Sequence, residues 1–125
     1  MRWCFGDAGP YADNVLDRLL TGDRALVPSL WCYEVVSVVA KSNWKGILST
    51  EQARSFLDRL ESLPIEIDEN SPQIIFNRVY LMAKRYRLTG YDATYLELAQ
   101  RKQLPIATLD EELRQAAMAA GVGLI

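Results

Sequence analysis

The chain has 125 residues, of which 50% are hydrophobic and 24% charged, and its formal net charge is -2. This length suits a single domain over residues 1–125, and this composition excludes a disordered or fibrous chain. The sequence contains no histidine, which excludes Ser-His-Asp catalysis, Cys-His catalysis and histidine-bound zinc. Any chemistry must therefore use carboxylates, hydroxyls, lysine or a bound cation.

The first predicted elements are a helix, a strand and a second helix. An apolar stripe over residues 15–20, after Pro10, predicts a helix that ends at the following Thr-Gly pair. An apolar run at 25–27 predicts a short strand, and Ser29 is placed to cap a helix that ends near Lys45. The remaining predicted elements are a helix opened by the Ser49–Gln52 capping box, a strand at 65–67, a helix from Ser71-Pro72 to about Tyr86, a helix from Thr89 to about Gln103, a strand at 105–108, a helix from Asp110 to about Ala120, and a strand at 121–125.

Strands that alternate with helices through short connections predict a layered α/β fold with a mostly parallel sheet. Cys4 and Cys32 lack a CxxC spacing, so we expect free, buried thiols. No apolar run approaches the roughly 18–20 residues that cross a bilayer, and the start is too short for a signal peptide. We therefore expect a cytoplasmic protein that does not enter a membrane.

Three acidic residues follow strands or open helices, where ligand sites of open α/β sheets lie. Glu34 sits in a helix that is apolar nearly all round, which predicts burial, and a buried carboxylate needs a hydrogen-bond or charge partner. Asp92 closes a possible capping box with Thr89, and Asp110 suits the N-cap of the last helix. Capping alone would explain Asp92 and Asp110 if each were considered singly.

Together, the three acids predict a cation site. Three carboxylates about 5 Å apart repel by about 3 kcal/mol per pair at an effective dielectric constant near 20, so they need a proton or a divalent cation between them. Hard oxygen ligands favour Mg2+ or Mn2+. A basic cluster in the second half of the chain is either a rim that holds phosphates or a solvated helix face. Its members are Lys84, Arg85, Arg87, Arg101 and Lys102.

Three segments resemble PIN domains of the VapC toxin type: VPSLWCYEVV at 27–36, LTGYDATYLELA at 88–99 and LPIATLDEEL at 104–113. That family comprises small metal-dependent ribonucleases, usually paired with an antitoxin, with four acidic residues around Mg2+ or Mn2+. The resemblance places Glu34, Asp92 and Asp110 on the second, third and fourth acidic positions, as catalytic residues and metal ligands. The resemblance gives Thr108 and Ser37 as substrate-binding residues, because Thr108 resembles a hydroxyl that orients a metal-bound water or phosphate, and Ser37 stands where family members often have asparagine.

The same resemblance implies a PIN-like three-layer α/β/α fold, RNA as substrate, a cognate antitoxin as partner and a homodimer. The family opens with a strand that ends in Asp-x-Ser, and residues 2–7 resemble the helical segment after it. The central first strand and the first acid would then lie upstream of Met1, and Asp7 would be no substitute. We therefore expect the strands at 25–27 and 105–108 to pair directly, or to be bridged by a second copy, and nuclease activity to be weak or absent.

Two other functions stay open. A catalytically impaired PIN-like protein would bind an antitoxin or another partner through apolar helix grooves without cutting RNA. A phosphoacceptor receiver domain shares the layered plan and an acidic metal pocket, but the tail at 121–125 lacks the lysine that receivers need after their fifth strand. Metal-dependent cleavage that is lost on Asp92→Asn separates a nuclease from a binding protein.

Overall fold

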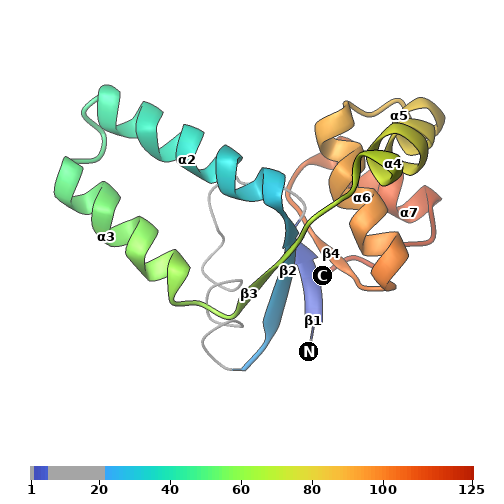
Figure 1. Cartoon of the computed structure of the whole chain (residues 1–125), viewed down its shortest axis with the longest axis horizontal. Helices are drawn as coiled ribbons and strands as arrows, with labels where there is room; N and C mark the ends of the chain where they lie inside the picture. Colours follow the sequence, from blue (N-terminus) through green and yellow to red (C-terminus); the bar gives the residue numbers. More distant parts are fainter. Residues whose placement is uncertain (1, 6–21) are drawn as a thin grey trace.

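The computed structural model of the chain describes residues 2–5 and 22–125. These residues form a four-stranded parallel sheet in the order β3-β2-β1-β4, with α2 and α3 reaching to one side and α4 to α7 gathered on the other (Figure 1). The described elements are β1 Arg2–Phe5, β2 Arg24–Pro28, α2 Ser29–Trp44, α3 Thr50–Glu61, β3 Ile65–Asp68, α4 Pro72–Ile74, η1 Ile75–Val79, α5 Tyr80–Tyr86, α6 Gly90–Lys102, β4 Ile106–Ala107 and α7 Glu111–Ala119. The predicted α/β class and parallel sheet are confirmed. The helix predicted over 15–20 and Asp7 lie outside the described residues.

Strand β1 occupies the centre of the sheet, which corrects the prediction of an absent central strand. Cys4 pairs with Leu26 on one side and with Ile106 on the other, and its backbone N–H donates to the carbonyl of Pro105 at 2.9 Å. The expected direct pairing of β2 with β4, or a bridge from a second copy, is therefore wrong. The physical reason is that β2 and β4 each present unpaired N–H and C=O groups toward the gap, and the extended segment at 2–5 satisfies both ladders.

The predicted closing strand at 121–125 is reduced to an isolated bridge. Leu124 makes a parallel bridge with Ile106, whose N–H donates to the carbonyl of Gly123 at 2.9 Å. Backbone pairing is limited to this one position because β4 itself spans only Ile106–Ala107. The end of the chain therefore covers the β4 edge without extending the sheet by a full strand.

Helix starts largely follow their capping residues. Ser49 and Gln52 form the predicted reciprocal capping box, and Ser71 accepts from the backbone N–H of Ile74 at 3.3 Å, with proline at the first helical position. Ser29 is the exception, because the chain enters α2 through Pro28 and no side chain caps the helix. Here the end of β2, rather than a capping hydroxyl, decides where the helix begins.

Helix α2 is half-exposed, which corrects the prediction that it is buried on all sides. Its buried residues, Trp31, Val35 and Val39, are spaced four apart and form a single stripe. Tyr33 and Val36 are 73% and 53% exposed. The reason is visible in Figure 1, where α2 leaves the end of β2 and projects away from the sheet with α3 beside it, so that only one stripe meets the core.

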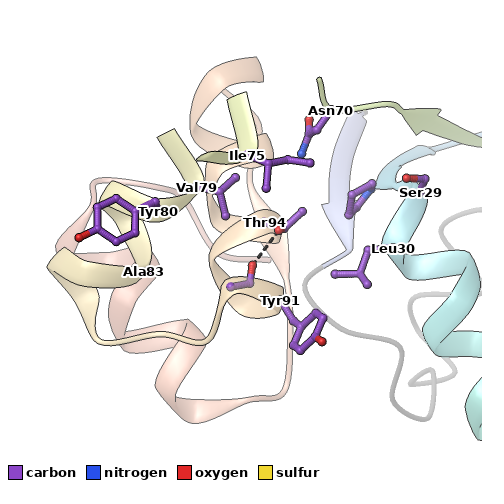
Figure 2. A pocket seen from close by; sticks show the side chains of 11 residues that line it. Ser29, Leu30, Asn70, Ile75, Val79, Tyr80, Ala83, Tyr91 and Thr94 are labelled. Atoms are coloured by element: carbon purple, nitrogen blue, oxygen red, sulfur yellow. Dashed lines mark hydrogen bonds between the residues drawn. The ribbon is translucent and has the colours of Figure 1, made fainter. Parts of the chain in front are cut away.

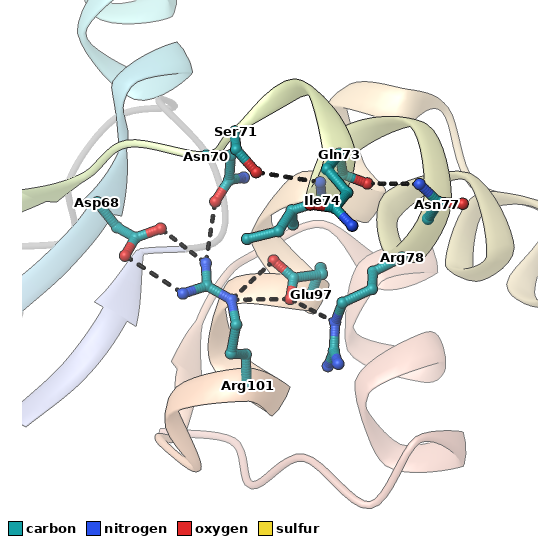
Figure 3. Close-up of polar contacts among 9 residues, drawn as sticks. All are labelled: Asp68, Asn70, Ser71, Gln73, Ile74, Asn77, Arg78, Glu97 and Arg101. Carbon is teal, nitrogen blue, oxygen red and sulfur yellow. Dashed lines mark hydrogen bonds and ion pairs between the residues drawn. The ribbon is translucent and has the colours of Figure 1, made fainter.

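The most buried helix is α6, which packs on β1 and β2 and carries a buried ion-pair network (Figure 3). Glu97 is fully buried and accepts from Arg101 Nε at 2.9 Å and from Arg78 Nε at 3.2 Å. Arg101 also donates to Asp68 at 2.7 Å and to Asn70 at 2.9 Å. These bonds satisfy a carboxylate that an apolar core would otherwise reject and tie the β3–α4 connection to α6. Arg101 is therefore part of an internal network, not of a basic rim.

Both cysteines are free thiols, as predicted. Cys4 is buried, as also predicted, whereas Cys32 is only half-buried. The Phe5 ring stacks on Trp31 with centroids 5.4 Å apart, which joins β1 to the start of α2. Within residues 2–5 and 22–125, no helix is both long and apolar enough to span a membrane.

Candidate active site

Asp92 stands in the first turn of α6, and its carboxylate does not act as a helix cap. Thr89 is the cap, because its hydroxyl oxygen accepts from the backbone N–H of Asp92 at 3.1 Å. In a full capping box the Asp92 carboxylate would also accept from the backbone N–H of Thr89, as Gln52 does from Ser49 at 2.9 Å. The described residues show no such bond at α6, so capping explains the backbone of Asp92 and leaves its carboxylate for other chemistry.

The electrostatics of Asp92 connect it with the other two predicted acids. Burial raises the pKa of Asp92, and the charges of Asp110 and Glu34 raise it further. A hydrogen bond with the Thr89 side chain works in the opposite direction, and the charge of Glu112 adds a smaller increase. The charges of Glu34 on α2 and Asp110 at the start of α7 therefore act on Asp92 of α6, and the convergence of the three carboxylates on one ion stays a prediction.

The half-buried carboxylate of Glu34 has the hydrogen-bond partner that its position requires. It lies on α2, and the hydroxyl of Tyr95 on α6 donates to its Oε1 atom. Tyr95 is 1% exposed, so the contact is made inside the molecule. This confirms the prediction that the carboxylate of Glu34 needs a hydrogen-bond or charge partner.

Asp110 caps α7, as its position predicts. Its Oδ1 atom accepts from the backbone N–H groups of Glu112 at 2.9 Å and Leu113 at 3.3 Å. Thr108 is buried, and its hydroxyl oxygen accepts from the backbone N–H of Asp110 at 3.1 Å. Arg114 holds the same turn by donating to the Thr108 carbonyl at 3.1 Å. The β4–α7 turn thus fixes Asp110 through one carboxylate oxygen and leaves Oδ2 without a hydrogen bond among the described residues.

The donor set fits a hard divalent cation in chemistry and charge. Asp92, Glu34 and Asp110 offer carboxylate oxygens, the ligands that Mg2+ and Mn2+ prefer, and after burial the charges of Asp110 and Glu34 raise the pKa of Asp92. The described residues nevertheless contain no group of three acidic or thiol side chains already placed to hold a metal ion. That the three acids share one ion therefore stays a prediction.

Ser37 and the basic cluster contribute little to this region. The Ser37 hydroxyl donates to the carbonyl of Tyr33 at 3.0 Å, so its hydrogen bond stays within α2. Arg85 lies over the Tyr86 ring, 5.5 Å from its centroid. Arg101 faces inward and Lys102 lies 3.9 Å from Asp68, so these two members of the cluster contact the acidic side chain that ends β3.

Two buried polar residues of α6, Tyr95 and Glu97, are not among the predicted site residues. Tyr95 follows Asp92 by three positions and therefore faces the same side of α6 one turn later. If Asp92 is a functional residue, this spacing alone predicts that Tyr95 lies near it. Glu97 is a charged residue amid the apolar positions of α6, a signal for a buried ion pair. Arg101 follows Glu97 by four positions, so spacing can suggest that pair, whereas Arg78, the other partner of Glu97, and Glu34, the partner of Tyr95, lie far away in the chain.

An apolar groove of about 610 Å³ opens between the start of α2 and the helices η1, α5 and α6 (Figure 2). It is lined by Pro28, Ser29, Leu30, Asn70, Ile75, Val79, Tyr80, Ala83, Gly90, Tyr91 and Thr94. Tyr91 directly precedes Asp92 in the chain, and Leu30 lies one helical turn before Glu34. Ile75 belongs to the π-helical turn η1, a feature frequent at functional sites. The groove can therefore bind apolar side chains of a partner, and its lining includes residues that lie close to Asp92 and Glu34 in the chain.

Comparison with known proteins agrees with this fold. Residues 3–118 match the PIN domain family. The chain is 33% identical to Ribonuclease VapC1 from Mycobacterium tuberculosis over 102 residues, which cover 82% of this chain and 74% of that protein.

Solved structures show the same fold. The crystal structure of PAE2754 from Pyrobaculum aerophilum has a TM-score of 0.74 at 24% identity, over 91% of this chain and 84% of that one. A chain of a toxin–antitoxin complex from Klebsiella pneumoniae has a TM-score of 0.54 at 19% identity, over 86% of each chain. At these identities the similarity shows a shared fold alone.

Proposed function

The chain belongs to the PIN domain family, and on that premise we propose that it is a ribonuclease that hydrolyses RNA phosphodiester bonds with Mg2+ or Mn2+ and is the toxin of a toxin–antitoxin pair. The observation that carries the proposal is the carboxylate of Asp92. It does not cap the helix, and its pKa is raised by burial and then by the charges of Asp110 and Glu34. The name of the Mycobacterium tuberculosis relative supports the same chemistry and substrate.

Asp92, Glu34 and Asp110 would hold the metal ion, each from a different helix. A bound Mg2+ or Mn2+ offsets charge on the scissile phosphate and lowers the pKa of a water molecule. Tyr95 leaves Oε2 of Glu34 available, and the α7 cap leaves Oδ2 of Asp110 available. The Thr108 hydroxyl holds the turn that carries Asp110, so its role is to orient that acid.

The test is the substitution Asp92→Asn, which keeps the shape and the backbone bond to Thr89. We expect Mg2+-dependent cleavage of RNA to fall at least about 100-fold, because losing a metal ligand costs more than losing one of its outer hydrogen-bond partners. Asp58→Asn is the matched control, since Asp58 is exposed on α3 and pairs with Arg54. EDTA should abolish the activity of the wild-type and control proteins. Cleavage that survives both EDTA and Asp92→Asn would overturn the proposal.

A second function, a protein that binds an antitoxin without cutting RNA, is favoured by the absence of a preformed three-residue metal group among the described residues. The groove beside the acids supports it, because its apolar lining suits the apolar side chains of an antitoxin tail. A wild-type protein that binds the antitoxin and shows no metal-dependent cleavage would select this function.

We also expect a homodimer formed by helix packing. Strand exchange at the sheet centre is no longer required, because β1 fills that position. The outer face of α2 offers exposed apolar side chains instead, with Tyr33 at 73% and Trp44 at 79% exposure. Light scattering should give twice the mass of one chain, and a single-chain mass at all concentrations would rule the dimer out.

A further inference from the structure

Tyr95 lies where α6 faces α2, and it links the two helices through one side-chain bond. It follows Asp92 by three positions, so the two side chains leave the same side of α6 one turn apart. Its hydroxyl donates to Oε1 of Glu34, and its ring is buried. The helix that carries Asp92 is thereby joined to the side chain of the acid opposite.

The bond orients Glu34 without consuming it. Among the described residues, no other hydrogen bond or ion pair reaches the Glu34 side chain, so Oε2 keeps its lone pairs. A phenol has a pKa near 10 and is a donor at neutral pH, and a hydrogen bond from a hydroxyl to a carboxylate is strong and directional. One oxygen is therefore fixed while the other remains available to a ligand.

The packing of α2 cannot fix this side chain alone. The fully buried residues of α2 form one stripe, Trp31, Val35 and Val39, and Glu34 is not part of it. A half-buried glutamate beside an exposed helix face has several rotamers to choose from. The hydroxyl of Tyr95 selects one of them.

We propose that Tyr95 is a positioning residue that orients Glu34 toward a divalent cation held together with Asp92. The proposal rests on the metal-dependent function proposed above. Carboxylates that bind metals are usually held by an outer hydrogen bond of this kind, and its loss typically weakens metal binding or activity by about 10–100-fold. A purely structural tyrosine would satisfy its hydroxyl at Glu34 and have no influence on metal binding.

The experiment is a double-mutant cycle on Mn2+ affinity, measured by calorimetry on the full chain. The proteins are the wild type, Tyr95→Phe, Glu34→Gln and the double variant. We expect Tyr95→Phe to weaken Mn2+ binding by about 10–100-fold, and to have little further effect once Glu34 is glutamine, because the tyrosine acts through that carboxylate. Thermal unfolding in EDTA records the stability of each protein separately.

Tyr86→Phe is the matched control. Tyr86 is a half-buried tyrosine on α5 whose hydroxyl makes no hydrogen bond among the described residues. Its loss should leave Mn2+ affinity unchanged. A Tyr95→Phe protein that binds Mn2+ within about twofold of wild type, or that loses the same factor again in the Glu34→Gln background, would show that Tyr95 does not act through Glu34.

Wild-type binding separates the two proposals. Wild-type protein that binds no Mn2+ overturns the metal site and this inference together, whereas wild-type binding with an unaffected Tyr95→Phe overturns the inference alone. If Tyr95→Phe does not fold, 13Cζ-tyrosine NMR of the wild type replaces it. We then expect the tyrosine signal that Glu34→Gln displaces to shift on Mg2+ addition, and no shift would count against the proposal.

Discussion

The carboxylate of Asp92 is proposed to bind a metal ion, but without metal its negative charge lowers the stability of the fold. Burial, followed by the charges of Asp110 and Glu34, raises its pKa above the usual 3.8. The folded state then binds the proton more tightly than the unfolded chain, so the free energy of unfolding falls as the pH rises from 3.8 through the raised folded value. Without metal, we therefore expect Asp92→Asn to raise the melting temperature at pH 7, and the gain to vanish below pH 3.8.

Melting curves in EDTA at both pH values check this expectation. Asp58→Asn should show no gain at either pH, because Asp58 is exposed and attracted to Arg54. A gain for Asp92→Asn that is the same at both pH values would mean that its charge is not the cause.

Strand β1 is an element whose place in the sheet can be tested through Cys4. Burial in the central strand raises the pKa of the Cys4 thiol to about 12, from a usual 9.0. This lowers its thiolate fraction by about 1000-fold, and the thiolate is the form that reacts. A disulfide reagent should therefore modify Cys32 in the native protein and reach Cys4 only after unfolding.

The Cys32→Ser protein isolates the signal of Cys4. Its remaining thiol should react slowly in buffer and at once in denaturant. Fast reaction in buffer would show that residues 2–5 do not form the central strand.

The connection from β3 to α4 is held by an ion-pair network, and burial determines how much this network contributes to the free energy of unfolding. Glu97 has a fully buried side chain, and the Arg101 side chain is 23% exposed. Hydrogen bonds to Asp68 and to Glu97 raise the pKa of Arg101, which keeps it charged. Arg101→Met leaves Glu97 with Arg78 as its remaining partner, and we expect a loss of about 3 kcal/mol, the lower end for a broken buried pair.

Urea unfolding measures this loss. The control is Arg54→Met, which removes an exposed ion pair within α3 whose side chains are 63% and 62% exposed. Its cost should stay below about 0.5 kcal/mol. Equal costs for the two substitutions would mean that burial of Glu97 does not set the energy of the network.

The whole molecule combines an acidic region and an apolar groove on neighbouring surfaces, which fits a nuclease controlled by a bound protein. Tyr80 is 57% exposed and lines the groove, whereas Phe76 on the same helical segment is 76% exposed and does not. We expect Tyr80→Asp to weaken binding of the cognate antitoxin by about 30-fold, the effect of a tyrosine worth about 2 kcal/mol at an interface. Phe76→Asp should leave binding unchanged. Pull-down of the antitoxin with both variants, alongside their Mn2+ affinities, measures the effect. Equal loss of binding in both variants would show that the antitoxin does not bind in the groove.

The sequence by itself determined the features that depend on neighbouring residues. Alternating strands and helices predicted the parallel α/β sheet, and the caps at Ser49, Ser71, Thr89 and Asp110 located helix starts, because a cap is satisfied within a few residues of chain. The resemblance to PIN domains was likewise carried by three short segments, and the match over residues 3–118 confirms it.

Only the tertiary structure decided the features that depend on distant partners. Residues 2–5 form a strand because β2 and β4 each need a hydrogen-bonding partner for their backbone groups. The sequence of this segment alone does not show that need. Glu34 meets Tyr95, and Glu97 meets Arg78, because α6 is packed between the other helices and the sheet. Helix α2 is exposed because it projects from the sheet, although its composition is that of a buried helix. Burial and pairing are properties of the packed chain, and local sequence specifies only which residues can take part.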